Sequence, residues 1–143
     1  MAACWLMKSE PEVYSIDDLA RDKKTGWDGV RNYQARNFLR DQIKEGDRVL
    51  FYHSNAEPPG IAGIAEVVRG GYPDPSAFLE GDVPVWYSVD VRFVKKFKDI
   101  LPLEKLRSVK GLETMLLLKR GQRLSVQPVT EKEWAVILKL AEK

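Results

Sequence analysis

The stretch EGDRVLFYHSNAEPPGIAGIAEVVRG, residues 45–70, predicts two consecutive β-strands and therefore a fold built around a sheet. Its first half alternates Val49, Phe51 and His53 with Leu50 and Tyr52, and its second half, GIAGIAEVVRG, is again rich in β-branched residues. The segment between the halves, NAEPPG, has the proline and glycine content of a turn. We therefore expect an antiparallel pair of strands here.

Further strands are expected on both sides of this pair. Residues 3–7 form an apolar run that ends before Pro11, and residues 85–97 place apolar side chains at odd positions from 85 to 93. RLSVQPV, residues 123–129, is a late strand. Strands near the start, centre and end with short helices between them predict an α+β fold, a small mixed barrel whose last strand returns to the first half.

Capping signals place three helices in the sequence. A side-chain oxygen that accepts from the backbone N–H two or three residues later begins a helix; the caps are Ser15 with Asp18, Asn32, and Thr130 with Glu133. The helix that starts at Asn32 is expected to run to about Gln42, with Tyr33, Arg36, Asn37 and Arg40 on the face opposite an apolar stripe. Shorter helices are expected within 101–109 and 111–120, and TGWDG, residues 25–29, is expected to be a loop.

Composition sets the broad class of the protein. The 143 residues, 44% hydrophobic and 31% charged, are typical of one globular domain. No apolar run is long enough for a membrane span, so no membrane partner is expected, and the single cysteine, Cys4, has no internal partner for a disulfide. We expect a reducing compartment: the cytoplasm of a bacterium or the nucleus of a eukaryote. The net charge of +2 means that binding to a polyanion requires a local patch.

The chain has few residues that are suited to catalysis, metal binding or cofactor binding. His53 is the only histidine, and a half-buried histidine hydrogen-bonded at a strand end is the expected role for it. No metal site is expected with one cysteine and one histidine, and no cofactor is expected without a glycine-rich phosphate loop. Lys8, Ser9 and Glu10 offer a base, a hydroxyl and an acid, although consecutive strand residues point to opposite faces.

The stretch GWDGVRNYQARNFLR, residues 26–40, combines side chains that are suited to ligand binding rather than to catalysis. Trp27 lies between glycines, where it serves either as a buried anchor or as a platform for stacking. Amides suited to base edges and guanidinium groups suited to phosphate surround it; the amides are Asn32, Gln34 and Asn37, and the guanidinium groups are Arg31, Arg36 and Arg40. An aromatic ring, amides and arginines together are typical of sites that bind unstacked bases.

Six ordered blocks of the chain resemble the EVE domain family. They are CWLMKSEP, TGWDGVRNYQARNFLR, EGDRVLFYHSN, PPGIAGIAEV, WYSVDVRFV and RLSVQPVT, which together span essentially the whole chain, residues 1–143. The resemblance implies a PUA-like fold, a small bent β-barrel with peripheral helices, related to YTH and ASCH domains. It also implies that the protein is a non-catalytic reader, which binds bases such as 5-methylcytosine or 5-hydroxymethylcytosine in DNA or RNA.

The resemblance further implies a pocket for the modified base. Its matching positions are Lys8, Ser9, Trp27, Val30, Arg31, Asn32, Tyr52, His53, Ser54, Leu124, Ser125 and Val126, with Arg31, Arg36 and Arg40 for the flanking phosphates. A reader of this kind would have a nucleic acid and a separate effector enzyme as partners, and the oligomeric state stays open. The alternatives are a small ASCH-like hydrolase of modified nucleosides that uses Lys8, Ser9 and Glu10, and a protein-interaction module that uses the loop at 72–84.

Overall fold

The computed structural model describes residues 2–75, 85–119 and 124–142. Its strands are β1 (Cys4–Ser9), β2 (Lys24–Trp27), β3 (Arg48–His53), β4 (Gly60–Pro73), β5 (Tyr87–Pro102) and β6 (Val126–Val129). Its helices are α1 (Ile16–Asp22), α2 (Tyr33–Asn37), the π-helical turn η1 (Phe38–Gln42), α3 (Leu103–Leu106), the 3₁₀ turn η2 (Leu116–Leu118) and α4 (Glu131–Ala141).

The strand pair predicted from residues 45–70 is confirmed. β3 pairs with β4 in antiparallel register, with Val49 opposite Ala65 and His53 opposite Gly60. The alternation along β3 buries both of its faces: Val49 and Phe51 contribute to one core cluster, and Leu50 and Tyr52 contribute to another. β3 therefore separates two cores.

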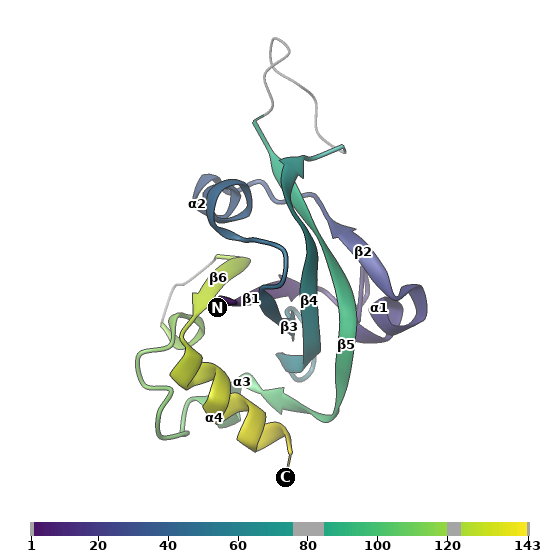
Figure 1. The fold of residues 1–143 in the computed structure, drawn as a ribbon. Coiled ribbons are helices and arrows are strands. Elements are labelled where there is room, and N and C mark those ends of the chain that lie inside the picture. Colours follow the sequence, from purple (N-terminus) through teal and green to yellow (C-terminus); the bar gives the residue numbers. More distant parts are fainter. Residues whose placement is uncertain (1, 76–84, 120–123, 143) are drawn as a thin grey trace.

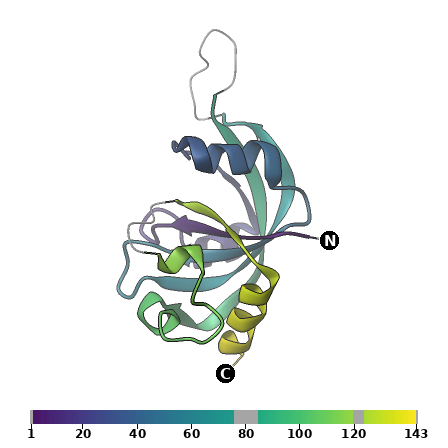
Figure 2. The same ribbon diagram turned by 90° about the vertical axis from the view of Figure 1, so that its left-hand side faces the viewer.

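The six strands form one sheet in the order β2-β5-β4-β3-β1-β6. β1 runs parallel to β3 and antiparallel to β6, so the last strand does return to the first half of the chain. β4 and β5 run side by side along the length of the molecule and curve, while β1 and β6 cross them at a steep angle (Figures 1 and 2). The predicted α+β class, with a bent sheet and short helices around it, is confirmed.

The predicted loop at 25–29 is wrong in its first half. Residues Lys24–Trp27 form β2, which pairs with β5 so that Gly26 lies opposite Asp90 and Trp27 opposite Val89. The local sequence carries a turn signal because of its glycines, but pairing with a strand more than 60 residues later overrides that signal. Gly26 suits this position, because a Cβ atom there would lie 3.0 Å from the Tyr72 hydroxyl oxygen.

The predicted helix caps are confirmed, and the helix that Asn32 caps ends in a π-helical turn. The Asn32 side-chain oxygen accepts from the backbone N–H of Ala35 at 3.0 Å. α2 and η1 lie across the upper part of β4 (Figure 1), and a Cβ atom on Gly71 would come within 2.3 Å of the Leu39 carbonyl oxygen. Glycine therefore permits this close approach of the helix to the strand.

The loop predicted at 72–84 was placed two residues too early at its start, because Tyr72 and Pro73 still belong to β4. Residues 76–84 of that loop lie outside the described residues. At the opposite end of the molecule from α2, α4 covers the sheet with Trp134 and Ile137 buried (Figure 1). In the part of the chain that the structure describes, no helix combines the length and the apolar character of a membrane span.

Candidate functional site

A cleft of about 310 Å³ opens where β1 ends, beside β2. It is lined by Lys8, Ser9, Val13, Tyr14, Thr25, Gly26, Trp27 and Asp28, which we call the β1–β2 cleft. Three of these residues were expected from the resemblance: Lys8, Ser9 and Trp27. The other lining residues were missed, because the pairing of β2 with β5 has no local sequence signal and the strand end expected before Pro11 does not show which later residues reach the cleft.

Trp27 forms one wall of the β1–β2 cleft and is also part of the core. Its side chain is only 8% exposed, and its ring meets Phe51 edge to face, with centroids 5.4 Å apart and planes at 84°. Ser88 fixes the backbone there, because its hydroxyl donates to the Trp27 carbonyl oxygen at 2.7 Å. Of the two roles left open by the sequence, the structure shows the buried anchor, with part of the residue still lining the cleft.

Lys8 and Ser9 mark the end of β1, and their side chains make contacts in different places. The Lys8 ammonium lies 5.8 Å from the centroid of Tyr52, the residue opposite it in β3. Burial lowers the pKa of Lys8, because the charged form loses hydration. The Ser9 hydroxyl donates to the Tyr14 carbonyl oxygen at 2.6 Å, and Glu10 is exposed. Lys8 and Asp28 therefore both line the cleft, while the Lys8 ammonium lies over Tyr52, which does not line it.

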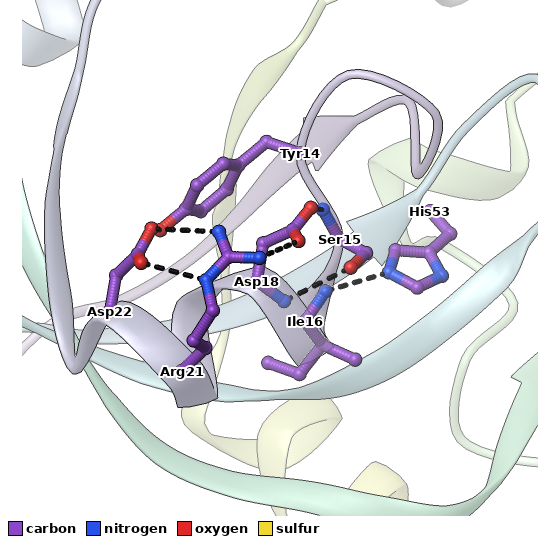
Figure 3. Close-up of polar contacts among 7 residues, drawn as sticks. All are labelled: Tyr14, Ser15, Ile16, Asp18, Arg21, Asp22 and His53. Atoms are coloured by element: carbon purple, nitrogen blue, oxygen red, sulfur yellow. Dashed lines mark hydrogen bonds and ion pairs between the residues drawn. The ribbon is translucent and has the colours of Figure 1, made fainter.

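Tyr14 forms the outer wall of the cleft and is held by α1 (Figure 3). Its hydroxyl donates to Asp22 at 2.9 Å, and Arg21 binds both Asp22 and Asp18 at 3.0 Å. Burial and this hydrogen bond raise the pKa of Tyr14, whereas bonds from Arg21 and then Tyr14 lower the pKa of Asp22. The ring is thus positioned by a polar network at the surface, and it remains the protonated donor near neutral pH.

His53 connects the end of β3 to the start of α1 (Figure 3). Its Nε2 atom accepts from the backbone N–H of Ile16 at 3.1 Å, and the residue is 6% exposed. Burial lowers the pKa of His53, and this hydrogen bond requires an unprotonated Nε2. The predicted histidine hydrogen-bonded at a strand end is confirmed. His53 lines a separate, larger hollow with Pro11, Pro58 and Ile100, and its contact with a base stays a prediction.

The segment that follows the cleft, residues 28–32, is organised by Asp74. This buried carboxylate accepts from the Gly29 backbone N–H at 2.8 Å and from Arg31 Nη1 at 3.0 Å. Val30 is buried in the core, and the Asn32 oxygen caps α2. Asp74 was missed from the sequence, where it stands in a proline-rich stretch typical of an exposed turn.

The remaining expected pocket residues lie around the cleft rather than within it. Ser125 accepts at its carbonyl oxygen from the Lys8 backbone N–H at 2.8 Å, which ties the late segment to the end of β1. Leu124 and Val126 are buried in the core beside it. Tyr52 is buried in the other core cluster, and the Ser54 backbone N–H donates to the Ser9 carbonyl oxygen.

The three arginines expected to contact phosphate differ in their surroundings. Arg40 forms two 2.8 Å contacts with Asp41, so its charge is balanced by its neighbour. Arg36 donates to the Val85 carbonyl oxygen at 2.8 Å and to Asn37, and no acidic residue is among these partners. Arg31 is paired with Asp74, and its side chain is as exposed as that of Arg40, at 39%. Arg36 is therefore better placed for a phosphate than Arg31 or Arg40.

Comparison with known proteins gives a consistent set of relatives. Residues 3–140 match the EVE domain. Human thymocyte nuclear protein 1 is 43% identical over an alignment of 172 residues that covers 100% of this chain and 76% of the relative. A crystal structure of a Pseudomonas syringae protein superposes with a TM-score of 0.90 at 49% identity, covering 97% of this chain and 99% of that one. The crystal structure of human THYN1 protein in complex with DNA containing 5-methylcytosine superposes with a TM-score of 0.89 at 43% identity, covering 99% of both chains.

Proposed function

This chain belongs to the EVE domain family, and from that premise we propose that it is a non-catalytic reader of modified bases of the 5-methylcytosine type in nucleic acid. The β1–β2 cleft would hold the modified base after it leaves its stack. Support comes from the human relative whose structure contains DNA with 5-methylcytosine, and from the cleft in this chain.

The cleft is the observation that carries this proposal. Its volume of about 310 Å³ is at the small end of the range for ligand sites in proteins, which suits one base rather than a larger ligand. Trp27 and Tyr14 offer aromatic surface to a flat ring, while Lys8, Thr25 and Asp28 offer donors and acceptors to its edge. Val13, which is 76% exposed at the rim, adds apolar surface.

The energetics fit a reader of moderate selectivity. Extruding a base costs a few kcal/mol, which aromatic contacts and hydrogen bonds to its Watson–Crick edge offset. A single methyl group in an apolar contact is worth about 1–3 kcal/mol, so a tenfold to few-hundredfold preference for the modified base is expected. Arg36 would add a salt-dependent attraction for phosphate that is independent of sequence, and Arg31 and Arg40, which are each paired with an aspartate, would contribute less.

The hydrolase alternative gains no support from the geometry. Lys8 lies over Tyr52 while the Ser9 hydroxyl is bonded to the Tyr14 carbonyl oxygen, so the two groups do not meet at one substrate. Glu10 is exposed, and its carbonyl oxygen accepts from the N–H groups of Val13 and Tyr14 in the turn after β1. A reader without a catalytic set would pass its signal to a separate effector enzyme.

Direct binding tests the proposal. We would measure the affinity of the protein for matched DNA and RNA oligonucleotides that carry cytosine, 5-methylcytosine or 5-hydroxymethylcytosine, at two salt concentrations. We expect the modified strands to bind roughly tenfold to a few hundredfold more tightly. Lys8→Met should reduce this ratio, because it removes an edge donor from the cleft.

Lys139→Met is the matched control, because it makes the same change on α4 at the far end of the molecule (Figure 1). It should leave the ratio unchanged. Equal affinity for all bases would contradict the reader, and an unchanged ratio in Lys8→Met would contradict the placement of the base. Incubation with free modified cytidine checks the hydrolase, since turnover that Glu10→Gln abolishes would replace the proposal.

A further inference from the structure

Four side chains on and around α2 are linked by contacts between rings and guanidinium groups. The contacts join Arg31 to Trp86, Trp86 to Tyr33 and Tyr33 to Arg36, and we call these four residues the α2 ladder. The Arg31 guanidinium carbon lies 5.4 Å from the centroid of Trp86. The rings of Trp86 and Tyr33 have centroids 5.0 Å apart and planes inclined by 32°, and the Arg36 guanidinium carbon lies 5.1 Å from the Tyr33 centroid. Each ring thus has the other ring and one guanidinium group as neighbours.

The ladder is not part of the packed interior. Tyr33 is 62% exposed, which makes it one of the most exposed large apolar side chains among the described residues. Neither Tyr33 nor Trp86 belongs to the two core clusters of the described residues. An exposed ring on a helix contributes little to folding, so packing does not account for this arrangement.

The arginines of the ladder are held in place by the backbone around them. Arg31 donates to Asp74 and to its neighbour's carbonyl oxygen at 3.0 Å, and Arg36 donates to the Val85 carbonyl oxygen at 2.8 Å. Val85 directly precedes Trp86, so the bond from Arg36 also fixes the segment that carries the second ring. A surface arranged before its ligand arrives loses less conformational entropy on binding.

The ladder is also close to the cleft along the chain. Asp28 lines the cleft, and Arg31 and Tyr33 follow it within five residues, over a segment that Asp74 holds through Gly29. A polynucleotide strand with one base in the cleft would therefore place a neighbouring nucleotide near the ladder. Aromatic faces flanked by guanidinium groups match such a nucleotide, because the base stacks on the ring and the cations attract the phosphates.

We propose that the α2 ladder is a second contact surface, on which an unpaired nucleotide adjacent to the modified one stacks against the exposed part of Tyr33, next to its contacts with Trp86 and Arg36. This inference rests on the proposed function and narrows its substrate to strands in which the flanking nucleotide is unpaired. A base held in a duplex has both faces covered by its neighbours and cannot offer one to Tyr33. Single-stranded or locally opened nucleic acid is thus the preferred ligand.

The test uses the full chain and a short single-stranded oligonucleotide with a central 5-methylcytosine. Tyr33→Ala should weaken binding roughly 5- to 150-fold, the range for the loss of one stacked base. It should leave the preference for 5-methylcytosine over cytosine unchanged. Tyr33→Phe keeps the ring and should bind as the wild type does. Val94→Ala, which alters an exposed apolar side chain on β5, should also have no effect.

Abasic substitution locates the effect in the strand. Removing the base next to the 5-methylcytosine should weaken wild-type binding by the same factor as Tyr33→Ala, and should weaken Tyr33→Ala binding no further. Equal affinities of Tyr33→Ala and wild type would show that the α2 ladder does not bind a nucleotide, and would not contradict the proposed recognition of the modified base. If the wild type binds without preference for the modified base and Tyr33→Ala binds more weakly, the proposed recognition of the modified base is wrong, and the role of the α2 ladder in binding is supported. A protein that binds no strand at all overturns both.

Discussion

The β1–β2 cleft and the α2 ladder both bring aromatic rings and cations together, but they differ in burial. Trp27 in the cleft is 8% exposed and packs edge to face on Phe51, whereas Tyr33 in the ladder is 62% exposed and contacts Trp86 and Arg36. The same kinds of side chain therefore serve two purposes. In the cleft the aromatic wall is part of the fold, and in the ladder the ring is available to a ligand at little cost in stability.

Trp27→Ala should produce the largest change in stability. Truncating a buried tryptophan that packs on Phe51 removes its contacts and leaves a cavity, so we expect a loss of about 3–5 kcal/mol in the free energy of unfolding. Tyr33→Ala, the matched change in the ladder, should stay within about 0.5 kcal/mol of the wild type. Urea unfolding followed by circular dichroism measures both. Similar losses for the two variants would remove the distinction between the regions.

Asp74→Ala should have an intermediate effect on stability and a direct effect on the link between the two regions. It removes the charged acceptor of two hydrogen bonds, from the Gly29 N–H and from Arg31, so we expect a loss of about 1–3 kcal/mol. Asp74→Asn keeps one oxygen acceptor and should lose less. Hydrogen exchange of the Gly29 amide reports on the segment itself: protection should fall in Asp74→Ala. Unchanged protection there would show that Asp74 does not hold this segment.

The smallest effect is a pH dependence that arises at His53, beside the cleft but away from the ladder. Its pKa in the folded protein lies below the ordinary value of 6.5, because burial disfavours the charged ring. The unfolded chain therefore binds more protons as the pH falls below about 6.5, and stability, complete above that pH, declines toward the lower pKa of the folded state. The slope stays below about 1.4 kcal/mol per pH unit, the limit for one proton.

Unfolding in urea between pH 7 and 5.5 checks this dependence, because no other histidine is present in the sequence. In His53→Gln the side-chain oxygen can accept from Ile16, and the variant should lose the slope over this range. Binding in the ladder should not follow the same titration. Stability that is constant or rises with acid in the wild type would contradict the account of His53.

The contrast between the two regions also explains what the sequence could and could not predict. Local patterns were sufficient for β3, β4, the helix caps and the exposed position of Tyr33, since each depends on alternation or on neighbours within four residues. Asn32 shows the limit of such reasoning. It was expected as a helix cap and as a reader of base edges, and its oxygen is used by the cap.

Contacts between distant segments decided everything else at the site. β2 forms only because β5 pairs with it, Asp74 reaches Gly29 across more than 40 residues, and Trp86, directly before β5, meets Tyr33 on α2. No pattern within residues 26–40 contains these partners. The sequence therefore predicted the kind of chemistry in that stretch, whereas its division into a buried cleft and an exposed ladder depends on the tertiary fold.

The four tryptophans allow one measurement that tests the whole account. Trp27 lines the cleft, Trp86 belongs to the ladder, and Trp5 and Trp134 are buried in separate core clusters. We would follow their indole N–H signals by ¹H–¹⁵N NMR while adding single-stranded oligonucleotides with cytosine or 5-methylcytosine. The account predicts that the Trp86 signal shifts with both strands and that the Trp27 signal shifts chiefly with 5-methylcytosine. The signals of Trp5 and Trp134 should not shift. A bound strand that leaves Trp27 unchanged, or that shifts Trp134 instead, would contradict it.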